Sequence, residues 1–449
     1  MASIGSVFIF ASCKAKSSNS VQPSRPNIIY IMADDLGYAD LGSFGSKKIK
    51  TPNIDQLARE GTRYTQFYAG SPVCAPARCV LMTGLHAGHA LIRSNSPKVG
   101  GQLEVFGEGS MRLSLTGKEA TVASILKNGG YATGISGKWG IGEPNSNAQP
   151  TQMGFDEWLG YLNQNHAPYY FTDFLWRNEE RQSIPENENG NREVYSNDLM
   201  RDFAIDFIQD HRSEPFFLYL PFTIPHSHME VPSLDEYADK DWPEDAKIYA
   251  AMVSRLDSYV GNIVDELERL GIADNTAVFF TSDNGPVNND RTVFFDSAAG
   301  KRGTKGTVYE GGLSVPLIVK WPGVVSKGDT DDTPWMFVDV FPTFIDMAGE
   351  SYSGNLDGVS LLPTILGENQ DLSDRFLYWE FPRDRLWQAG RLGNWKGVRH
   401  GMDQPLELYD LQKDPFETND ISKNHSGIVK DFERRFEEEH EPSPHWPVN

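Results

Sequence analysis

The sequence predicts an α/β fold: a large, mixed but mostly parallel sheet between helices, followed by a smaller C-terminal antiparallel α+β subdomain. Two observations carry this prediction. Apolar strand-like runs alternate with helix-like segments over roughly the first 366 residues, and short alternating strands replace them afterwards. A third observation is size, because 449 residues with 12% aromatics can fill a large interior.

The strands and helices of the first part follow one another along the chain. Residues 27–33 (NIIYIMA) are continuously apolar, which is typical of a strand buried in a parallel sheet. Thr51 and Pro52 begin a helix that ends at Gly61. Further strands are predicted at 131–136, 216–222 and 277–281, and further helices at 120–127, 197–211 and 247–270. This order indicates a doubly wound layer.

The character of the chain changes after Leu366. Short strands are predicted at 375–380, 395–399 and 407–410, followed by a helix at 428–439. We therefore predict three parts: a leader and tether (1–24), a catalytic domain (25–366) and a C-terminal subdomain (367–449).

Charge and cysteine content narrow the class of protein. The formal charge is −21, from 41 basic and 62 acidic residues, which argues against nucleic acid or an anionic membrane surface as a partner. The three cysteines, Cys13, Cys74 and Cys79, form no evident disulfide framework.

The first residues have the pattern of an export signal. The apolar run 6–11 (SVFIFA) leads through small residues to Cys13, which resembles a bacterial lipoprotein cleavage site with a lipid anchor at that cysteine. The run is about half the length of a membrane-spanning helix, and no basic residue precedes it. We expect an exported protein, periplasmic or membrane-anchored, of a Gram-negative bacterium; the alternative is a disordered terminus.

Polar residues follow four of the predicted strands. Asp34 and Asp35 follow the first strand, and Lys138, His226 and the pair Asp283-Asn284 follow later ones. Ligands of open α/β sheets bind beyond the carboxyl ends of the strands, so these residues predict a site. The three carboxylates and one carboxamide offer only oxygen, which suits Ca²⁺ or Mg²⁺ better than zinc.

Cys74-Ala75-Pro76-Ala77-Arg78 fits C-x-P-x-R, the pattern at which maturation enzymes convert cysteine to formylglycine. The hydrated aldehyde has two hydroxyls on one carbon: one can attack the sulfur of a sulfate ester, and the other can re-form the carbonyl and expel sulfate. Alone, the pentapeptide is also compatible with a buried structural cysteine. The longer run SPVCAPARCVLMTGLHAGH resembles the type I, formylglycine-dependent sulfatases, arylsulfatase-like members of the alkaline phosphatase superfamily.

The resemblance extends from about residue 26 to 425, because 407–419 (ELYDLQKDPFETN) resembles a sulfatase C-terminal segment. It implies an alkaline phosphatase-like fold, a formylglycine-generating enzyme as partner, and Ca²⁺ (Mg²⁺ as the alternative) as cofactor. The resemblance also implies a role for each site residue. Cys74 would become the formylglycine nucleophile, supported by Arg78, and Lys138 and Lys305 would bind the sulfate. His226 would protonate the leaving alcohol, with His228 as a neighbour that competes for this role. The implied metal site consists of Asp34, Asp35, Cys74, Asp283 and Asn284.

One position departs from the family pattern. Many sulfatases read Gly-Lys-Trp-His, with the histidine on a formylglycine hydroxyl, but this chain has Gly140 there. Another base is then needed for release of sulfate, and the candidates are His86, His89 and Asp283.

The substrate implied by the resemblance is a sulfated carbohydrate. The segments 86–95 and 161–178 look like the subgroup acting on 4-sulfated galactose or N-acetylgalactosamine, with His166 and Trp176 as sugar contacts. Two alternatives are a phosphate or phosphonate ester hydrolase of the same superfamily and a catalytically silent glycan-binding lipoprotein.

Overall fold

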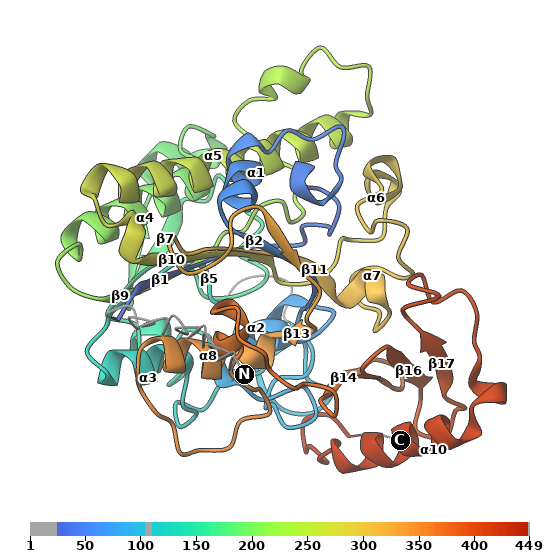
Figure 1. Ribbon diagram of the computed structural model, residues 1–449. Helices are drawn as coiled ribbons and strands as arrows, with labels where there is room; N and C mark the ends of the chain where they lie inside the picture. The colour runs from blue at the N-terminus through green and yellow to red at the C-terminus, as the bar shows by residue number, and fades with distance from the viewer. Residues whose placement is uncertain (1–24, 104–109, 448–449) are drawn as a thin grey trace, which may run out of the picture.

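The computed structural model describes residues 25–103 and 110–447, so the predicted leader with Cys13 lies outside the described residues. Within them, a large sheet lies between two layers of helices, and a smaller sheet packs beside it (Figure 1). None of the described helices is both long and apolar enough to cross a membrane. The predicted fold class is confirmed, with an antiparallel rim that the sequence did not specify.

The large sheet has a parallel centre and antiparallel flanks. Its order is β12-β2-β11-β10-β1-β9-β5-β6-β7-β8, with β13 beside β2. The run β10-β1-β9-β5-β6 is parallel, whereas β11 and β7 pair antiparallel with their neighbours. The strands are β1 Asn27–Ala33, β2 Thr62–Tyr68, β5 Ala132–Lys138, β6 Glu157–Tyr161, β7 Phe174–Arg177, β8 Glu180–Ser183, β9 Phe216–Pro221, β10 Thr276–Ser282, β11 Ser314–Lys320, β12 Asp329–Asp331 and β13 Trp335–Met336.

Each face of this sheet has its own hydrophobic core. Helices α1, α4 and α5 cover one face, and α2, α3 and α8 cover the other (Figure 1). The apolar residues of β1 contribute to both cores. Tyr30 and Met32 belong to one core and Ile29 and Ile31 to the other, because successive side chains of a strand point to opposite faces. The helices are α1 Pro52–Glu60, α2 Cys74–Thr83, α3 Val122–Asn128, α4 Ser196–Asp210, α5 Glu244–Leu270, α6 Asp290–Phe295, α7 Glu310–Leu313, α8 Val340–Met347 and α9 Leu362–Ile365.

The C-terminal part is an antiparallel sheet of four strands covered by a helix. Its strands are β14 Phe376–Pro382, β15 Leu386–Leu392, β16 Trp395–His400 and β17 Glu407–Asp410, and its helix is α10 Ser426–Glu438. Phe432 and Phe436 of α10 pack into the small core of this sheet. A separate hairpin joins β3 Gln102–Leu103 to β4 Met111–Arg112. The exact boundary at 366/367 stays a prediction.

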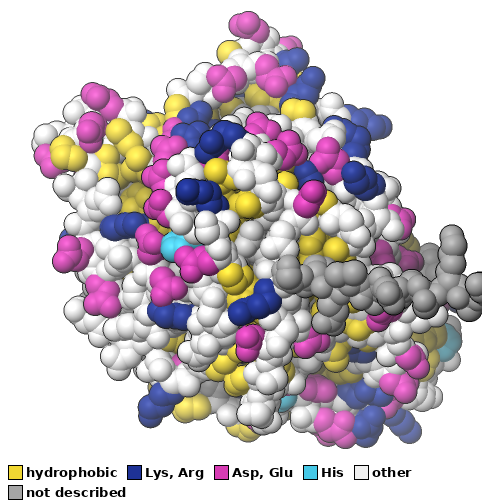
Figure 2. Space-filling view, turned by 60° about the vertical axis from the view of Figure 1, so that its left-hand side comes forward, with side chains coloured by type: hydrophobic (Ala, Val, Ile, Leu, Met, Phe, Trp, Pro, Cys, Tyr) yellow, Lys and Arg dark blue, Asp and Glu magenta, His cyan; other side chains and the backbone are white. Residues whose placement is uncertain are grey.

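The acidic excess is spread over the surface. Figure 2 shows Asp and Glu side chains scattered over the visible face, with Lys and Arg among them. The charged groups at the carboxyl edge of the large sheet, by contrast, are mostly buried.

Candidate active site

The carboxyl ends of the central parallel strands bring the predicted polar residues together. Strands β1 and β10 are neighbours in register, with Ala33 opposite Ser282, so the acidic residues that follow each strand meet. The Asp35 N–H donates to Asp283 Oδ1 at 3.1 Å. Lys138, which was expected just beyond its strand, is the last residue of β5, and His226 follows β9.

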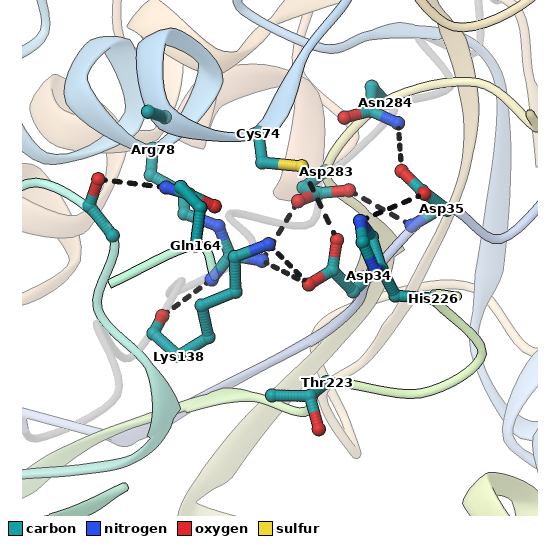
Figure 3. A network of polar contacts seen from close by, with 12 residues as sticks. Asp34, Asp35, Cys74, Arg78, Lys138, Gln164, Thr223, His226, Asp283 and Asn284 are labelled. Carbon is teal, nitrogen blue, oxygen red and sulfur yellow. Dashed lines mark hydrogen bonds and ion pairs between the residues drawn. The ribbon is translucent and has the colours of Figure 1, made fainter. Parts of the chain in front are cut away.

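Cys74 is the first residue of α2 and is 1% exposed. Its Sγ lies 3.5 Å from Asp34 Oδ1 (Figure 3) and 3.3 Å from Lys305 Nζ. Burial raises the pKa of the Cys74 thiol to about 12, and the nearby lysines Lys138 and Lys305 only partly oppose this. An unmodified cysteine here stays protonated and is therefore a poor nucleophile.

Arg78 lies one helical turn after Cys74 and so faces the same site. Its guanidinium is 2.8 Å from Asp283 Oδ2 and 3.5 Å from Asp34 Oδ2, and it also donates to the backbone carbonyl of Lys138. With the side chain 1% exposed, Arg78 joins three strand ends and helix α2 into one buried network.

Two lysines complete the charge balance of the site. Lys138 Nζ is 2.7 Å from Asp34 Oδ2, and Lys305 Nζ is 2.6 Å from Asp35 Oδ1. The three carboxylates (Asp34, Asp35, Asp283) thus face three cationic side chains (Arg78, Lys138, Lys305), so these six groups sum to zero. A divalent cation would make the site net positive, which suits an anionic substrate.

The pKa values of the three carboxyl groups shift in different directions from their usual range. Burial alone would raise the pKa of Asp34, but Lys138, His226 and Arg78 together hold it well below its usual range. The pKa of Asp35 is lowered in the same way against its burial, chiefly by Lys305. Burial, together with repulsion from Asp34, raises the pKa of Asp283 to about 6.

The donor set fits a hard divalent cation. Asp34, Asp35, Cys74 and His226 each place a ligand-type atom within 4.8 Å of the others. Asn284 Nδ2 donates to Asp35 Oδ1 at 2.7 Å, whereas the buried Asn284 Oδ1 has no hydrogen-bond partner among the described residues. A buried acceptor left over beside carboxylate oxygens is what an oxygen-ligated Ca²⁺ or Mg²⁺ would use.

His226, rather than His228, faces the cluster. Its Nε2 is 3.4 Å from Asp35 Oδ2, and its Nδ1 is 2.5 Å from the Ser227 carbonyl. Burial lowers the pKa of His226, against the raising effect of Asp35 and Asp34. His228 is exposed and stands edge-on to Tyr169, with ring centroids 4.9 Å apart.

A cavity of about 760 Å³ opens above Cys74 and His226. The other residues around it are Asn95, Ser110, Arg112, Gln164, Asn165, Pro168, Tyr169, Ser227 and His228. Tyr169, half exposed, belongs to its rim. Apart from His228, these residues were not predicted as site residues, although the sequence assigns the segments 86–95 and 161–178 to the substrate.

The expected sugar contact at His166 needs correction. His166 is 2% exposed, its Nε2 pairs with Thr172 Oγ1 at 2.7 Å, and its ring packs edge-on to Tyr161. Burial, with a further contribution from Arg181, lowers its pKa to about 3. Neither His166 nor Trp176 lines the cavity above Cys74, so their neighbours in sequence are the better candidates.

The suggested bases His86 and His89 lie at the wrong end of α2. The helix runs from Cys74 to Thr83, so its ends are about 14 Å apart at 1.5 Å per residue. His86 Nε2 is instead 2.9 Å from Glu439 Oε2, and His89 Nδ1 is 2.9 Å from Asp357 Oδ1.

The His86, His89 and Glu439 side chains are close enough to resemble a second metal site. However, the Gly88 N–H donates to His86 Nδ1 at 3.1 Å, so the neutral ring carries its proton on Nε2 and donates it to Glu439. This cluster is therefore a hydrogen-bonded contact between the segment after α2 and the C-terminal part.

Comparisons with known proteins identify the family of this chain. Residues 26–350 match a family model described as Sulfatase, and residues 302–441 match the C-terminal model of N-sulphoglucosamine sulphohydrolase. The chain is 30% identical to human N-acetylgalactosamine-6-sulfatase, covering 85% of this chain and 75% of the relative. It is 27% identical to N-acetylgalactosamine-6-O-sulfatase of Bacteroides thetaiotaomicron, covering 94% and 95%.

The chain is also similar in fold to solved structures. The crystal structure of Ps i-CgsB in complex with k-i-k-neocarrahexaose has a TM-score of 0.79 and 29% identity, covering 95% of each chain. A phosphonate monoester hydrolase of Agrobacterium radiobacter, with a TM-score of 0.67 and 20% identity over 92% of this chain and 95% of that one, shares the fold alone.

Proposed function

Because the chain belongs to the sulfatase family, and is thus a sulfuric ester hydrolase, we propose that it removes sulfate from a sulfated carbohydrate with a formylglycine at position 74. The observation that carries this proposal is the place of Cys74. It lies at the N-terminus of α2, where the helix dipole is positive, with Sγ between Asp34 and Lys305.

The reaction takes two steps. In the first, one hydroxyl of the hydrated aldehyde attacks sulfur: R–CH(OH)₂ + R′–O–SO₃⁻ → R–CH(OH)–O–SO₃⁻ + R′–OH. Lys138 and Lys305 stabilise the charge on the transferring sulfo group, and His226 gives a proton to the leaving alcohol, which the proton lost by the attacking hydroxyl replaces. In the second, the other hydroxyl re-forms the aldehyde and sulfate leaves: R–CH(OH)–O–SO₃⁻ → R–CHO + HSO₄⁻. Addition of water then restores the diol: R–CHO + H₂O → R–CH(OH)₂.

A divalent cation, Ca²⁺ with Mg²⁺ as the alternative, would be held by Asp34, Asp35, Asp283 and Asn284. When bound, it would supply Lewis-acid stabilisation of oxygen charge.

The cavity supports a sugar rather than a small aryl ester as the natural substrate. At about 760 Å³ it is in the size range of ligand pockets, and its wall offers amide, hydroxyl and guanidinium groups. Tyr169 and His228 add an exposed aromatic pair at the rim, on which a pyranose ring can pack. Two relatives are named for N-acetylgalactosamine, and a structural neighbour holds k-i-k-neocarrahexaose. We therefore propose a sulfated galactose or N-acetylgalactosamine unit of a polysaccharide.

The test is release of sulfate from defined mono-sulfated saccharides by protein made with a formylglycine-generating enzyme. The panel includes 4- and 6-sulfated galactose and N-acetylgalactosamine, 4-nitrophenyl sulfate and 4-nitrophenyl phosphate. We expect turnover of at least one galactose-type sulfate and little of the phosphate. Turnover of the phosphate above every sulfate would support the phosphate ester hydrolase instead, and activity on the aryl sulfate alone would overturn the carbohydrate substrate.

A further inference from the structure

Gln164 fills the space beside Gly140, the position at which the chain departs from the family pattern. A Cβ on Gly140 would lie 2.4 Å from Gln164 Nε2 and 3.3 Å from Arg78 Cδ. The backbone of Gly140 has φ +79°, which also favours glycine. A side chain from position 164 thus occupies the place that a side chain at position 140 would take.

The carboxamide of Gln164 has a fixed orientation. Its Nε2 donates to the Gly140 carbonyl at 2.9 Å, so its Oε1 points to the opposite side, away from that carbonyl (Figure 3). Gln164 is 8% exposed, and its Oε1 is buried without a hydrogen-bond partner among the described residues. A buried acceptor without a donor is costly, so it marks a place where a donor is expected.

The diol proposed at position 74 would supply such a donor. Gln164 and Cys74 line the same cavity. A thiol carries one heteroatom on its carbon, and that atom is directed to Asp34 and Lys305. A geminal diol carries a second oxygen on the same carbon, which must lie on another side and has a proton to donate.

The site contains two buried side-chain oxygens that lack partners among the described residues, on Asn284 and on Gln164. The proposed cation accounts for the Asn284 oxygen. It does not account for the oxygen of Gln164, whose carboxamide nitrogen and carbon lie 2.4 Å and 3.4 Å from the place of a Cβ on Gly140.

We propose that Gln164 Oε1 accepts a hydrogen bond from the non-attacking hydroxyl of the residue 74 diol and orients it for release of sulfate. This inference rests on the proposed function. An amide oxygen is too weak a base to keep the proton, so Gln164 holds the hydroxyl. In that step the C–O bond to the sulfate breaks, the electron pair of the O–H bond forms the second carbon–oxygen bond of the aldehyde, and the proton leaves with sulfate as HSO₄⁻.

The test compares matured wild type with three variants. Gln164→Met keeps the size and removes the acceptor, Gln164→Asn withdraws it by one methylene, and Gln164→Glu keeps an acceptor but loses the donor to Gly140. For Met and Asn we expect kcat to fall about 10²-fold, the lower end for loss of one hydrogen bond at a reacting group, with KM little changed. We expect Glu to retain more activity than either. Mass spectrometry of rapidly quenched turnovers should show sulfo-enzyme on residue 74 accumulating in the Met and Asn variants but not in wild type.

A second readout needs no substrate. Loss of the acceptor should shift the diol toward free aldehyde, so an aminooxy probe should label residue 74 faster in the Met and Asn variants than in wild type. Wild-type kcat with unchanged labelling in both variants would overturn the inference, as would a rise in KM alone, which would place Gln164 on the sugar. Failure of the proposed function looks different: wild type in which mass spectrometry shows formylglycine at residue 74 would release no sulfate from any substrate, while the probe reaction would still report on Gln164.

Discussion

Lys396→Met should destabilise the protein far more than the same substitution at an exposed lysine. Lys396 Nζ lies 2.9 Å from both Glu310 Oε1 and Glu417 Oε1, and the three side chains are at most 6% exposed. Removing the lysine leaves two carboxylates buried without their shared cation. Loss of one partner from a buried ion pair costs about 3–5 kcal/mol, whereas an exposed pair contributes about 0–1 kcal/mol.

Lys413→Met is the matched control, because Lys413 pairs with Asp410 at 2.7 Å but its side chain is 81% exposed. Equilibrium unfolding in denaturant at constant metal concentration measures both variants. We expect a loss of about 3–5 kcal/mol for Lys396→Met and under about 1 kcal/mol for Lys413→Met. Equal losses would refute the reasoning from burial.

The loss of unfolding free energy caused by Lys396→Met should also grow with pH. Burial, then repulsion from Glu310 against the attraction of Lys396, already raises the pKa of Glu417 to about 7. Without Lys396 this pKa rises further, so the folded state keeps a proton that an unfolded glutamate has lost by about pH 5. Raising the pH then favours the unfolded state, and the deficit should be larger at about pH 8 than at about pH 5.

Activity should fall with stability in this variant. Glu310 is five residues after Lys305, and its N–H also donates to Glu417 Oε2 at 2.7 Å. The C-terminal part thereby holds the segment that places Lys305 beside Cys74.

Three further outcomes are expected. His226→Ala should lose about 10²–10⁴-fold in kcat/KM on a sugar sulfate but far less on 4-nitrophenyl sulfate, whose leaving group needs no proton; equal losses on both would contradict a role in protonation. Chelation with EDTA should abolish sulfate release, and the cation that restores it, Ca²⁺ or Mg²⁺, identifies the metal; full activity after chelation would contradict a metal site. The hydrogen bond to Asp357 raises the pKa of His89, although partial burial opposes this. The pair should therefore stabilise the folded protein below about pH 6.5, and this contribution should be lost as the pH rises through the raised pKa. Asp357→Asn should flatten this dependence in thermal unfolding, and an unchanged profile would contradict it.

The sequence predicts which acidic residues and lysines lie together at the sheet edge, because their placement follows from local rules. Asp34 and Asp283 each follow a run of apolar residues, and adjacent parallel strands bring such residues to one edge. The antiparallel pairing of β11 with β2 was not foreseen, since it joins segments about 250 residues apart and leaves no local signal.

Burial explains the errors around α2 and His166. All ten residues of Cys74–Thr83 are buried, so the helix has no polar face and no helical period to detect. Without that helix, His86 looked close to Cys74 because it is close in sequence. His166 has the residue type of a ligand-binding group, but only the packing of Tyr161 and Thr172 around it shows that it is interior.

The space beside Gly140, which the side chain of Gln164 fills, shows a related limit of prediction from sequence. The sequence reveals that a histidine is absent at 140, but it cannot show that a side chain 24 positions away turns into the same space.

The most direct test of the account is to measure sulfate release against the fraction of residue 74 converted to formylglycine, in preparations made with increasing amounts of the maturation enzyme. Peptide mass spectrometry gives the converted fraction, and a matched Cys74→Ala preparation gives the background. We predict that the rate is proportional to the converted fraction and reaches background at zero conversion. Sulfate release by protein in which Cys74 is entirely unconverted would contradict the central claim.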